Sequence, residues 1–598
     1  MFEPQSVNEF GSDLPEPISR HVWRERYRAH SPEGHPLEAE IGQSWRRVAR
    51  SIAASENDSH RWAEEYRQLF DDFKFLPGGR ILASAGTTHR ATLFNCFVMG
   101  AIEDDLGAIF SHLREGALTL QHGGGVGYNF STLRPRGALI RGQGATSSGP
   151  VSFMQIWNEA CATIMSGGAR RGAMMALLSC SHPDIAEFVA SKRVGGRLTN
   201  FNISVGLSDA FMAAVRRDET WPLVFDGQVF AEVTARTLWN QMMEAAYESG
   251  EPGVVFLERM NARNNLYYCE EIVGTNPCGE VPLPNYGACL LGSLNLAAFV
   301  RDPFTCHAQL DEARLVESTH KAVRFLDSTI DQSRFPLPQQ RDEARAKRRL
   351  GLGITGLADA LLMCNVRYDA PEGLELLQRW MSHVRNESFR ASAMLAEEKG
   401  PFPLFDRDKF LDGANVRRLP ADIRDQIARG GIRNGVLNSI APAGSISLLA
   451  NNVSSGVEPI FSADCVRRVR TSDGSFQSVR VTDYAVALYR GMRGQRDGIP
   501  DAYTDASSIG VRAHIAMQAM AQSLTDGAVS KTVNVPQDYP YPEFERLYLE
   551  AFDAGCKGCT AFRPNGVRPS ILHGLDSLDA KPEGECRQPE RVECAVCL

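Results

Sequence analysis

Cys278 stands two residues from an amide and two residues from a carboxylate, in the run Asn276-Pro277-Cys278-Gly279-Glu280. These five residues therefore offer a sulfur, a hydrogen-bonding amide and a proton acceptor. Pro277 and Gly279 disfavour a regular helix or a central strand. We expect a tight loop that brings the three functional side chains together. The alternative is a turn with an incidental buried thiol, because a cysteine is often a small core residue.

Other thiols stand in pairs that also suit redox or metal chemistry. The chain has 14 cysteines in 598 residues, which is too sparse for a disulfide scaffold. Cys556 and Cys559 have C-x-x-C spacing, and so do Cys594 and Cys597 near the C-terminus. The four could form a structural zinc site. The segment between the pairs is longer than the usual zinc-ribbon spacing, which favours thiol–disulfide exchange by Cys594 and Cys597 and a structural or incidental role for the first pair.

Helices alternate with short strands along most of the chain, which indicates a parallel α/β architecture. Apolar residues at helical spacing predict a helical region from 37 to 73. Further predicted helices cover 151–165, 350–363 and 374–398. Predicted strands cover 253–257, 435–440 and 531–535. The strands cannot be counted from this pattern.

Composition limits the classes of function. Hydrophobic residues make up 43% and charged residues 23%, as in ordinary globular enzymes. A net charge of −8 gives no footprint for a nucleic-acid polymer. The start lacks a signal-peptide pattern and no apolar run has membrane-spanning length, so a cytoplasmic protein is expected. From residue 569 onward the chain is polar and charged, which predicts a flexible tail.

Several motifs occur in an order that resembles the large chains of ribonucleotide reductases. The resemblance runs from about the first helix to Arg563, and the details resemble the adenosylcobalamin-dependent class II branch. Besides the Cys278 run, the motifs are Phe75-Leu76-Pro77-Gly78-Gly79-Arg80, Phe94-Asn95-Cys96-Phe97-Val98, Gly123-Gly124-Gly125-Val126-Gly127-Tyr128-Asn129, Ser166-Gly167-Gly168-Ala169-Arg170-Arg171-Gly172, Asn202-Ile203-Ser204-Val205, Ala441-Pro442-Ala443-Gly444-Ser445-Ile446-Ser447 and Gly555-Cys556-Lys557-Gly558-Cys559-Thr560.

The resemblance implies a fold and three segments. The expected fold is α/β, a ten-stranded α/β barrel with a central finger loop that carries Cys278. Residues 1–74 would form a mostly helical region, 75–568 the barrel and 569–598 the flexible tail with its redox C-x-x-C pair.

The resemblance also implies roles in the removal of a ribose 2′-hydroxyl. Cys278 would become the thiyl radical that abstracts the 3′-hydrogen, and Glu280 would be the general base. Asn276 would orient the substrate. Cys96 and Cys289 would supply two electrons and become a disulfide, which requires a fold that brings them within bridging distance.

Binding residues follow from the same comparison. Substrate-binding positions would be Asn95, Gly124, Pro277, Gly279, Ala443, Gly444, Ser445, Ile446, Ser447 and Arg80, although many relatives carry a small hydroxyl residue in place of Arg80. Hydroxyls and small residues at a helix N-terminus suit a phosphate; a simple helix cap is the alternative. Effector positions for a dNTP or ATP would be Asp104, Arg170, Arg171, Lys192 and Arg197, against the alternative of solvated surface loops.

The radical source distinguishes the branches of the family. Class I large chains carry adjacent tyrosines where this sequence has Thr560-Ala561-Phe562-Arg563. This difference favours adenosylcobalamin in a single chain, expected as a homodimer with thioredoxin or a similar protein as reductant. The alternatives are a class I large subunit with a separate radical-generating partner, a nucleotide-binding regulatory protein, and a zinc-binding interaction protein.

Overall fold

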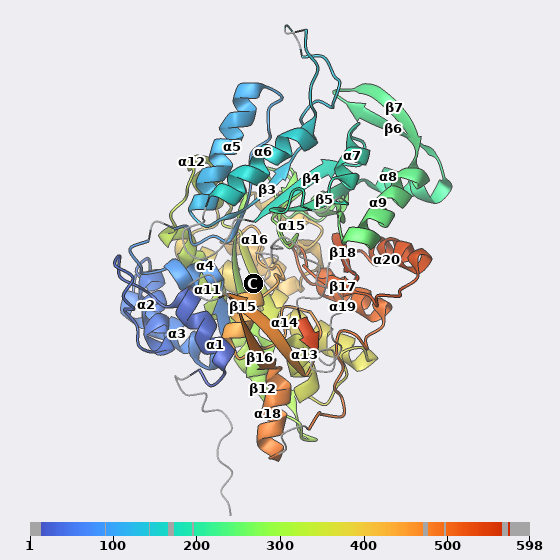
Figure 1. Ribbon diagram of the computed structural model, residues 1–598. Coiled ribbons are helices and arrows are strands. Elements are labelled where there is room, and N and C mark those ends of the chain that lie inside the picture. Colours follow the sequence, from blue (N-terminus) through green and yellow to red (C-terminus); the bar gives the residue numbers. More distant parts are fainter. Residues whose placement is uncertain are drawn as a thin grey trace, which may run out of the picture.

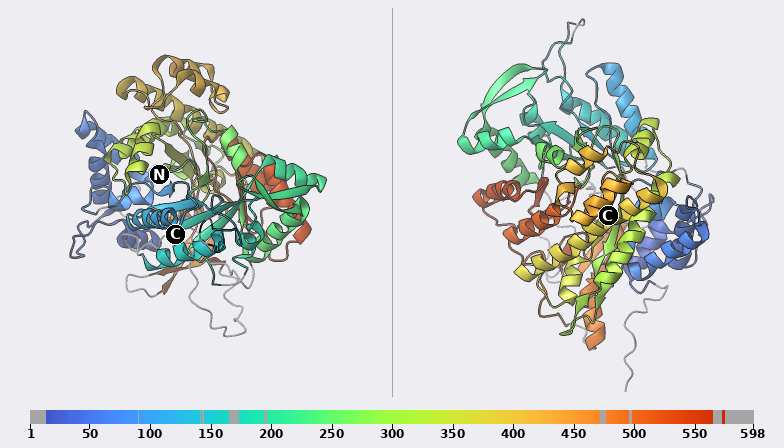
Figure 2. Two further views of the ribbon diagram at one scale, coloured as in Figure 1. Left: turned by 90° about the horizontal axis from the view of Figure 1, so that it is seen from above. Right: turned by 180° about the vertical axis from the view of Figure 1, so that it is seen from behind.

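The computed structural model describes residues 14–89, 91–140, 142, 144–164, 173–193, 196–470, 476–494, 498–564 and 572–574. A large sheet lies at the centre and helices surround it, with the N-terminal helices on one side (Figures 1 and 2). Among the described residues, no helix has the length and apolar character that crossing a membrane requires.

The N-terminal region consists of α1 (Pro17–Val22), the π turn η1 (Trp23–Tyr27), α2 (Ile41–Ala53), α3 (Ser59–Phe70) and η2 (Asp71–Phe73). The buried face of α2 carries the predicted apolar spacing, and a capping box between Glu40 and Gln43 fixes its start. The predicted single helical region is divided at 54–58, because Asp58 accepts a hydrogen bond from the Arg61 N–H and starts a new helix.

The central sheet has ten strands and confirms the expected α/β fold class. Its order is β1 (Phe75–Pro77), β11 (Ala288–Asn295), β2 (Cys96–Val98), β3 (Gly125–Asn129), β4 (Met174–Ser179), β5 (Phe201–Leu207), β8 (Gly253–Phe256), β18 (Gly558–Phe562) and β17 (Thr532–Asn534), with β14 (Leu350–Thr355) also on β11. β2, β3, β4, β5 and β8 run parallel, whereas the β11–β2 and β8–β18 pairs are antiparallel. The sheet is therefore mixed rather than wholly parallel.

An extended segment joins the two ends of this sheet. Leu352 of β14 forms a parallel bridge with Asn438, and Ile440 forms another with Val529, just before β17. The predicted strand at 435–440 is thus present as isolated bridges rather than as a regular strand. These bridges bring the ends of the sheet together, as a barrel requires.

The predicted helix at 350–363 is half wrong. Residues 350–355 form β14, and only Leu357–Met363 is helical, as α13. Every residue of β14 is buried, so the strand shows no alternation of polar and apolar residues that would reveal it. Gly356, at φ +69°, makes the turn between strand and helix.

Helices pack outside the central sheet, and three small sheets stand apart from it. The remaining helices are α4 (Gly79–Ser84), α5 (Leu106–Gln121), α6 (Pro150–Thr163), α7 (Ile185–Ala190), α8 (Asp209–Arg217), α9 (Ala235–Ser249), α10 (Leu257–Ala262), η3 (Leu296–Phe299), α11 (Glu312–Gln332), α12 (Pro338–Lys347), α14 (Pro371–Lys399), α15 (Arg407–Asp412), η4 (Val416–Arg418), α16 (Ala421–Gly430), α17 (Gly444–Leu449), α18 (Tyr484–Arg493), α19 (Val511–Ser523) and α20 (Tyr541–Asp553). Separate ribbons are β6 (Thr220–Phe225) with β7 (Gln228–Thr234), β12 (Val300–Arg301) with β13 (Gln309–Leu310), and β15 (Asp464–Arg470) between β16 (Phe476–Thr482) and β19 (Leu572–Gly574).

Candidate active site

The Cys278 run forms the tip of a short hairpin. β9 (Gly274–Thr275) pairs with β10 (Pro282–Leu283), so residues 276–281 make the turn. The Asn276 side-chain oxygen accepts from the Val281 N–H at 3.0 Å, and the Asn276 carbonyl accepts from the Gly279 N–H at 3.0 Å. Gly279 has φ +80°, which favours glycine. The predicted tight loop is therefore present.

This hairpin, which we call the finger, contacts strands of the central sheet. Asn202 on β5 donates its side-chain N–H to the Pro277 carbonyl at 2.9 Å. A Cβ on Gly127 of β3 would lie only 2.1 Å from the Thr275 carbonyl oxygen, so this position has no room for a side chain. The Ala528 N–H donates to the Glu280 carbonyl at 2.9 Å from the other side. Elements far apart in sequence thus hold the finger tip.

The thiol of Cys278 lies at the more open part of the tip. Cys278 is half-buried, whereas Asn276 and Glu280 are buried. A Cβ built on Gly279 would meet no atom within 4 Å. There is consequently space beside Cys278 for a reacting group.

Glu280 has the properties of a general base. Burial raises the pKa of its carboxyl to about 7, although its hydrogen bond with Asn276 opposes the rise. Its Oε2 atom is buried and has no hydrogen-bond partner among the described residues. A substrate hydroxyl could supply that missing donor. A carboxylate with a pKa near neutrality is well suited to exchange a proton at physiological pH.

The fold brings Cys96 and Cys289 together across an antiparallel ladder. Cys96 on β2 is the direct partner of Cys289 on β11. Such partners have Cα atoms about 4.5–5.5 Å apart, within the range that a disulfide spans. Asn276 donates to the Cys96 sulfur at 3.4 Å, which connects the pair to the finger. Burial, reinforced by the negative charge of Glu280, raises the pKa of Cys289 well above its usual range.

The predicted phosphate-binding segment begins a helix. Ala443 is the N-cap of α17, and Gly444, Ser445 and Ile446 form its first turn. The first N–H groups of a helix have no partner within it and can face an anion. The Ser455 hydroxyl holds the Ala443 N–H at 2.8 Å, and the Tyr27 hydroxyl donates to Ser445 Oγ at 2.6 Å. The N-terminal region therefore contacts this segment.

Three other predicted substrate positions gather where β2 and β3 begin. Asn95 precedes β2, and its carbonyl accepts from the Gly125 N–H at 2.8 Å. Its side-chain oxygen is buried and has no partner among the described residues. Gly124 packs on Phe97, and Arg80 lies against Gly123, where a Cβ would come within 2.5 Å of its guanidinium.

The predicted effector residues lie elsewhere and are partly engaged with neighbours. Asp104 forms an ion pair with Arg134 at 2.6 Å, and Lys192 forms one with Glu251 at 2.6 Å. Arg197 is exposed. Arg170 and Arg171 lie outside the described residues, as do Cys594 and Cys597 of the tail.

Two supports of the finger were not singled out from sequence. Asn202 stands in a quoted motif, and the alternation of Asn202 and Ser204 with apolar residues could have shown that its side chain faces inward. Ala528 contributes only its backbone, so its residue type carries no signal.

The thiol pair, the buried carboxylate and the finger within a ten-stranded sheet define a redox enzyme of the α/β-barrel class. The family described as "Ribonucleotide reductase, barrel domain" matches residues 94–562, and "Ribonucleotide reductase, all-alpha domain" matches residues 13–90. The chain belongs to the ribonucleotide reductase family.

Among the relatives compared, those with vitamin B12-dependent names are more similar to this chain than the subunit alpha of another reductase. A vitamin B12-dependent ribonucleoside-diphosphate reductase of Mycobacterium tuberculosis (strain CDC 1551 / Oshkosh) is 38% identical, over 94% of this chain and 82% of the relative. A protein of the same name from Thermoplasma acidophilum is 33% identical, over 87% of this chain and 68% of the relative. A ribonucleoside-diphosphate reductase subunit alpha of Chlamydia pneumoniae is 26% identical, over 72% of this chain and 46% of the relative.

Proposed function

We propose that the chain is a vitamin B12-dependent ribonucleotide reductase that converts ribonucleoside diphosphates to 2′-deoxyribonucleotides for DNA synthesis. The observation that carries the proposal is the meeting of Cys278, Glu280 and the Cys96–Cys289 pair around one finger. The names of the relatives at 38% and 33% identity support cobalamin and a diphosphate substrate. The direct test is formation of dCDP from CDP by the purified chain with a dithiol and adenosylcobalamin. A parallel reaction with CTP decides between diphosphate and triphosphate.

Each residue of the site has one role in a balanced reaction. The Cys278 thiyl radical takes the 3′-hydrogen atom, and Glu280 accepts the proton of the 3′-hydroxyl while the 2′-hydroxyl leaves as water. Cys96 and Cys289 give two electrons and two hydrogens and form a disulfide. Glu280 then returns its proton to the 3′-oxygen, and Cys278 returns the hydrogen atom to C3′ and becomes a thiyl radical again. Asn276, which bonds Cys96, orients the substrate, and the first turn of α17 with Asn95 and Gly124 binds it.

The residues present fit an adenosylcobalamin beside the finger. The space at Gly279 adjoins Cys278, and the next inward residue on β5 after Asn202 is Ser204. A Cβ on Gly253 would lie 3.1 Å from Ser204 Oγ and 2.9 Å from Thr560 Oγ1, so these small side chains form one wall. Ser204 and Thr560 would hold the nucleoside part of the cofactor. When bound, the cofactor supplies the radical that Cys278 receives.

The class I alternative requires a route for a radical from a partner subunit. The place of the tyrosine pair lies on β18, where Ala561 and Phe562 stand instead. The Ala561 N–H donates to the Tyr548 hydroxyl at 3.3 Å, but burial raises the pKa of Tyr548 well above its usual range and no second tyrosine adjoins it in β18. These residues favour radical formation within one chain.

Glu280→Gln should lower kcat by about 10²–10⁴-fold, because an amide cannot accept the 3′-hydroxyl proton. In the unaltered enzyme the base must be ionised, and its pKa is raised to about 7. The rate should therefore be full above pH 7 and fall about tenfold per pH unit below it. Rates between pH 5.5 and 9 measure this fall, which we call the acid limb of the pH–rate profile. Asn276→Asp, which keeps the loop but adds a carboxylate, should move the limb to higher pH. Normal turnover of Glu280→Gln would make Glu280 a structural residue.

Truncation before Cys594 should separate two reductants. A small dithiol can enter the site, so turnover with it should continue. With thioredoxin, turnover should stop after the first disulfide between Cys96 and Cys289, because the exchange relay is missing. The measurement is product per chain with each reductant. Cys594→Ser with Cys597→Ser is the matched variant that keeps the tail length. Equal loss with both reductants would favour a structural zinc role, and no loss would remove the tail from catalysis.

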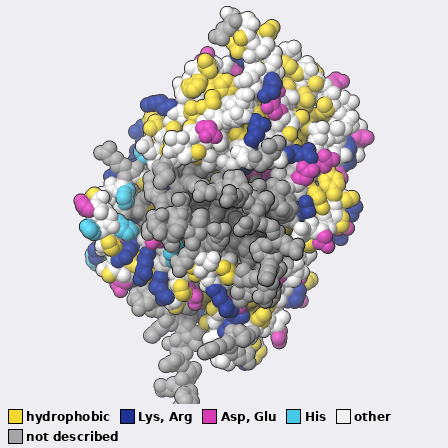
Figure 3. All heavy atoms as spheres, viewed as in Figure 1, with side chains coloured by type: hydrophobic (Ala, Val, Ile, Leu, Met, Phe, Trp, Pro, Cys, Tyr) yellow, Lys and Arg dark blue, Asp and Glu magenta, His cyan; other side chains and the backbone are white. Residues whose placement is uncertain are grey.

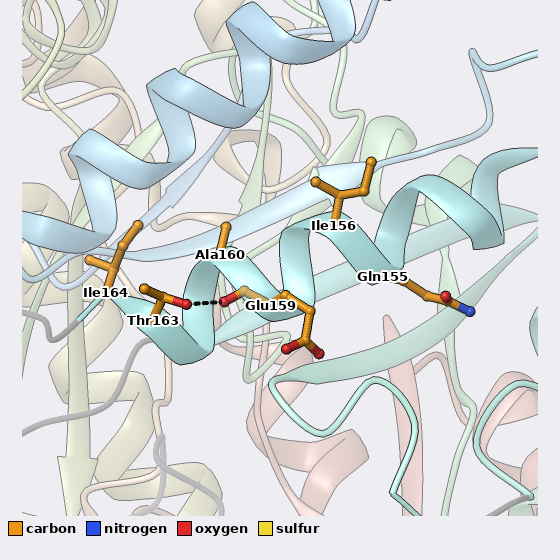
Figure 4. Close-up of a pocket in the computed structure, with 6 residues that line it drawn as sticks. All are labelled: Gln155, Ile156, Glu159, Ala160, Thr163 and Ile164. Atoms are coloured by element: carbon orange, nitrogen blue, oxygen red, sulfur yellow. Dashed lines mark hydrogen bonds between the residues drawn. The ribbon is translucent and has the colours of Figure 1, made fainter.

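The exposed surface of α5 and α6 is the proposed site of dimer formation and of effector control. Leu106 and Phe110 lie one turn apart on α5 and are 60% and 47% exposed, and Ile156 on α6 is 38% exposed. Figure 3 shows hydrophobic side chains gathered over this part of the molecule. A shallow pocket runs along α6 between Gln155 and Ile164 (Figure 4). A second copy of the chain would cover these side chains.

Asp104 lies just before α5, and Asn200, three residues after Arg197, donates its backbone N–H to the Asn158 side chain on α6 at 3.0 Å. A dNTP or ATP bound near Asp104 and Arg197 would therefore act across this interface. Arg170, Arg171 and Lys192 complete the proposed effector set. The division at 74/75 and 568/569 and the cytoplasmic location also remain proposals.

A further inference from the structure

Lys557, in the Cys556-Lys557-Gly558-Cys559 run, is a buried cation that the reaction does not use. Lys557 is only 2% exposed. Its neighbours Cys556 and Cys559 belong to the hydrophobic core. The Lys557 Nζ donates to two successive carbonyls, those of Asp526 at 2.8 Å and Gly527 at 2.6 Å. The two cysteines of this run are therefore core residues, and the lysine between them binds the backbone of residues 526 and 527.

A single peptide unit connects Lys557 to the finger. The Gly527 carbonyl, which accepts from Lys557, and the Ala528 N–H belong to the same planar group. That N–H donates to the Glu280 carbonyl at 2.9 Å. Because the C=O and N–H of a trans peptide point in opposite directions, a bond that fixes one fixes the other. Gly527 also packs too closely for a side chain, since a Cβ would lie 2.1 Å from Ser439 Oγ.

The Asp526 carboxylate holds the same segment from the other side. Its oxygens accept from the N–H groups of Leu437 at 3.0 Å and Asn438 at 2.7 Å, and from the Asn265 side chain at 2.9 Å. Leu437 and Asn438 belong to the extended segment that joins the ends of the sheet. Residues 526–528 therefore link that segment, the start of β18 and the finger tip.

An apolar pair could fill this volume at lower cost, because buried charges lose their hydration. Burial lowers the pKa of Lys557 to about 7 and raises that of Asp526 above its usual range. An apolar residue, however, could not hold two successive carbonyls and thereby aim the Ala528 N–H. Lys557 and Asp526 together therefore fix the orientation of the Gly527–Ala528 peptide group.

We propose that Lys557, held with Asp526, is a positioning residue that fixes the backbone of Glu280 through the Gly527–Ala528 peptide. The inference rests on the proposed function, because it gives Glu280 its role as the base. Lys557 itself does not touch the substrate.

The test is Lys557→Met in the full chain, which keeps length and volume but removes the donors. We expect kcat to fall about 10–100-fold, as small misplacements of a reacting group do, with KM changed less than about twofold. A loosened tip admits water to Glu280, so the acid limb of the rate profile should move below pH 7. Hydrogen exchange of the finger peptide, residues 274–283, should rise by about tenfold or more.

Lys531→Met is the matched control. The Lys531 side chain is fully buried and pairs with Glu458 at 2.8 Å, close to β17 but without a bond to the finger. It should lower thermal stability to a similar extent while leaving the acid limb and the exchange of the finger unchanged. If Lys557→Met fails to fold, the double variant Lys557→Met with Asp526→Asn removes both charges and gives the same readouts.

A finger that exchanges as slowly as in the unaltered enzyme, with the acid limb in place, would overturn the inference. So would exchange that rises equally along the whole chain, as loss of a merely structural contact predicts. Exchange is measured without turnover, so it judges the anchoring even if Glu280→Gln retains activity and the proposed function fails.

Discussion

Cys278→Ser should reduce turnover by at least about 10⁴-fold, equivalent to about 5 kcal/mol of lost transition-state stabilisation. A serine O–H bond is much stronger than the S–H bond of a thiol, so serine cannot exchange a hydrogen atom reversibly with C3′. The change adds no volume at a half-buried position beside open space. We therefore expect normal folding and nearly normal nucleotide binding. Product formation, thermal unfolding and equilibrium binding of the nucleotide measure the three properties.

Cys364→Ser is the control for this variant. Cys364 is also half-buried, but it ends α13 and has no contact with the finger. Its replacement should leave turnover close to that of the unaltered enzyme. A Cys278→Ser enzyme that still reduces nucleotides would remove Cys278 from the reaction. Loss of nucleotide binding together with turnover would instead make the residue part of the binding surface.

The residue types around Cys278 predict its local structure because the determinants are local. Pro277 and Gly279 exclude helix and central strand, and the structure has a turn there. The same holds for α17, where a small residue caps a helix. The placement of Cys96 opposite Cys289 came from resemblance alone. It depends on a pairing between β2 and β11, which are separated by almost 190 residues, and no short-range pattern encodes such a register.

Burial hides other features from the sequence. β14 is enclosed on both faces and is followed almost directly by the apolar helix α13, so residues 350–363 form one apolar run in which a buried strand is not distinguished from a helix. The finger is held by backbone groups such as the Ala528 N–H, which every residue except proline offers. The Lys557 side chain reaches carbonyls rather than a carboxylate, so no charge pattern in the sequence points to its contact.

Omission of adenosylcobalamin should eliminate nucleotide reduction altogether. The site has thiols, an amide and a carboxylate, and none of these groups produces a radical unaided. The place of a tyrosine pair on β18 holds Ala561 and Phe562, so no stepwise route from a partner subunit is evident there. Addition of the cofactor to the purified chain, with CDP and a dithiol, should restore dCDP formation in air as well as without oxygen. The relatives at 38% and 33% identity carry names that state vitamin B12 dependence, which supports this expectation.

Hydroxocobalamin is the control, because it presents the same corrin without the adenosyl group and should bind without supporting turnover. Thr560→Leu is a matched variant in the proposed wall next to Ser204 and Gly253. It should weaken cofactor binding, measured as the change in cobalamin absorbance on titration, because the added carbons occupy the place of the nucleoside and remove a hydroxyl. Reduction that proceeds without cobalamin after addition of a metal-containing second subunit would overturn the assignment and establish the class I alternative. Since β18 carries Ala561 and Phe562 where class I chains carry the tyrosine pair, that outcome would also require a different path to Cys278.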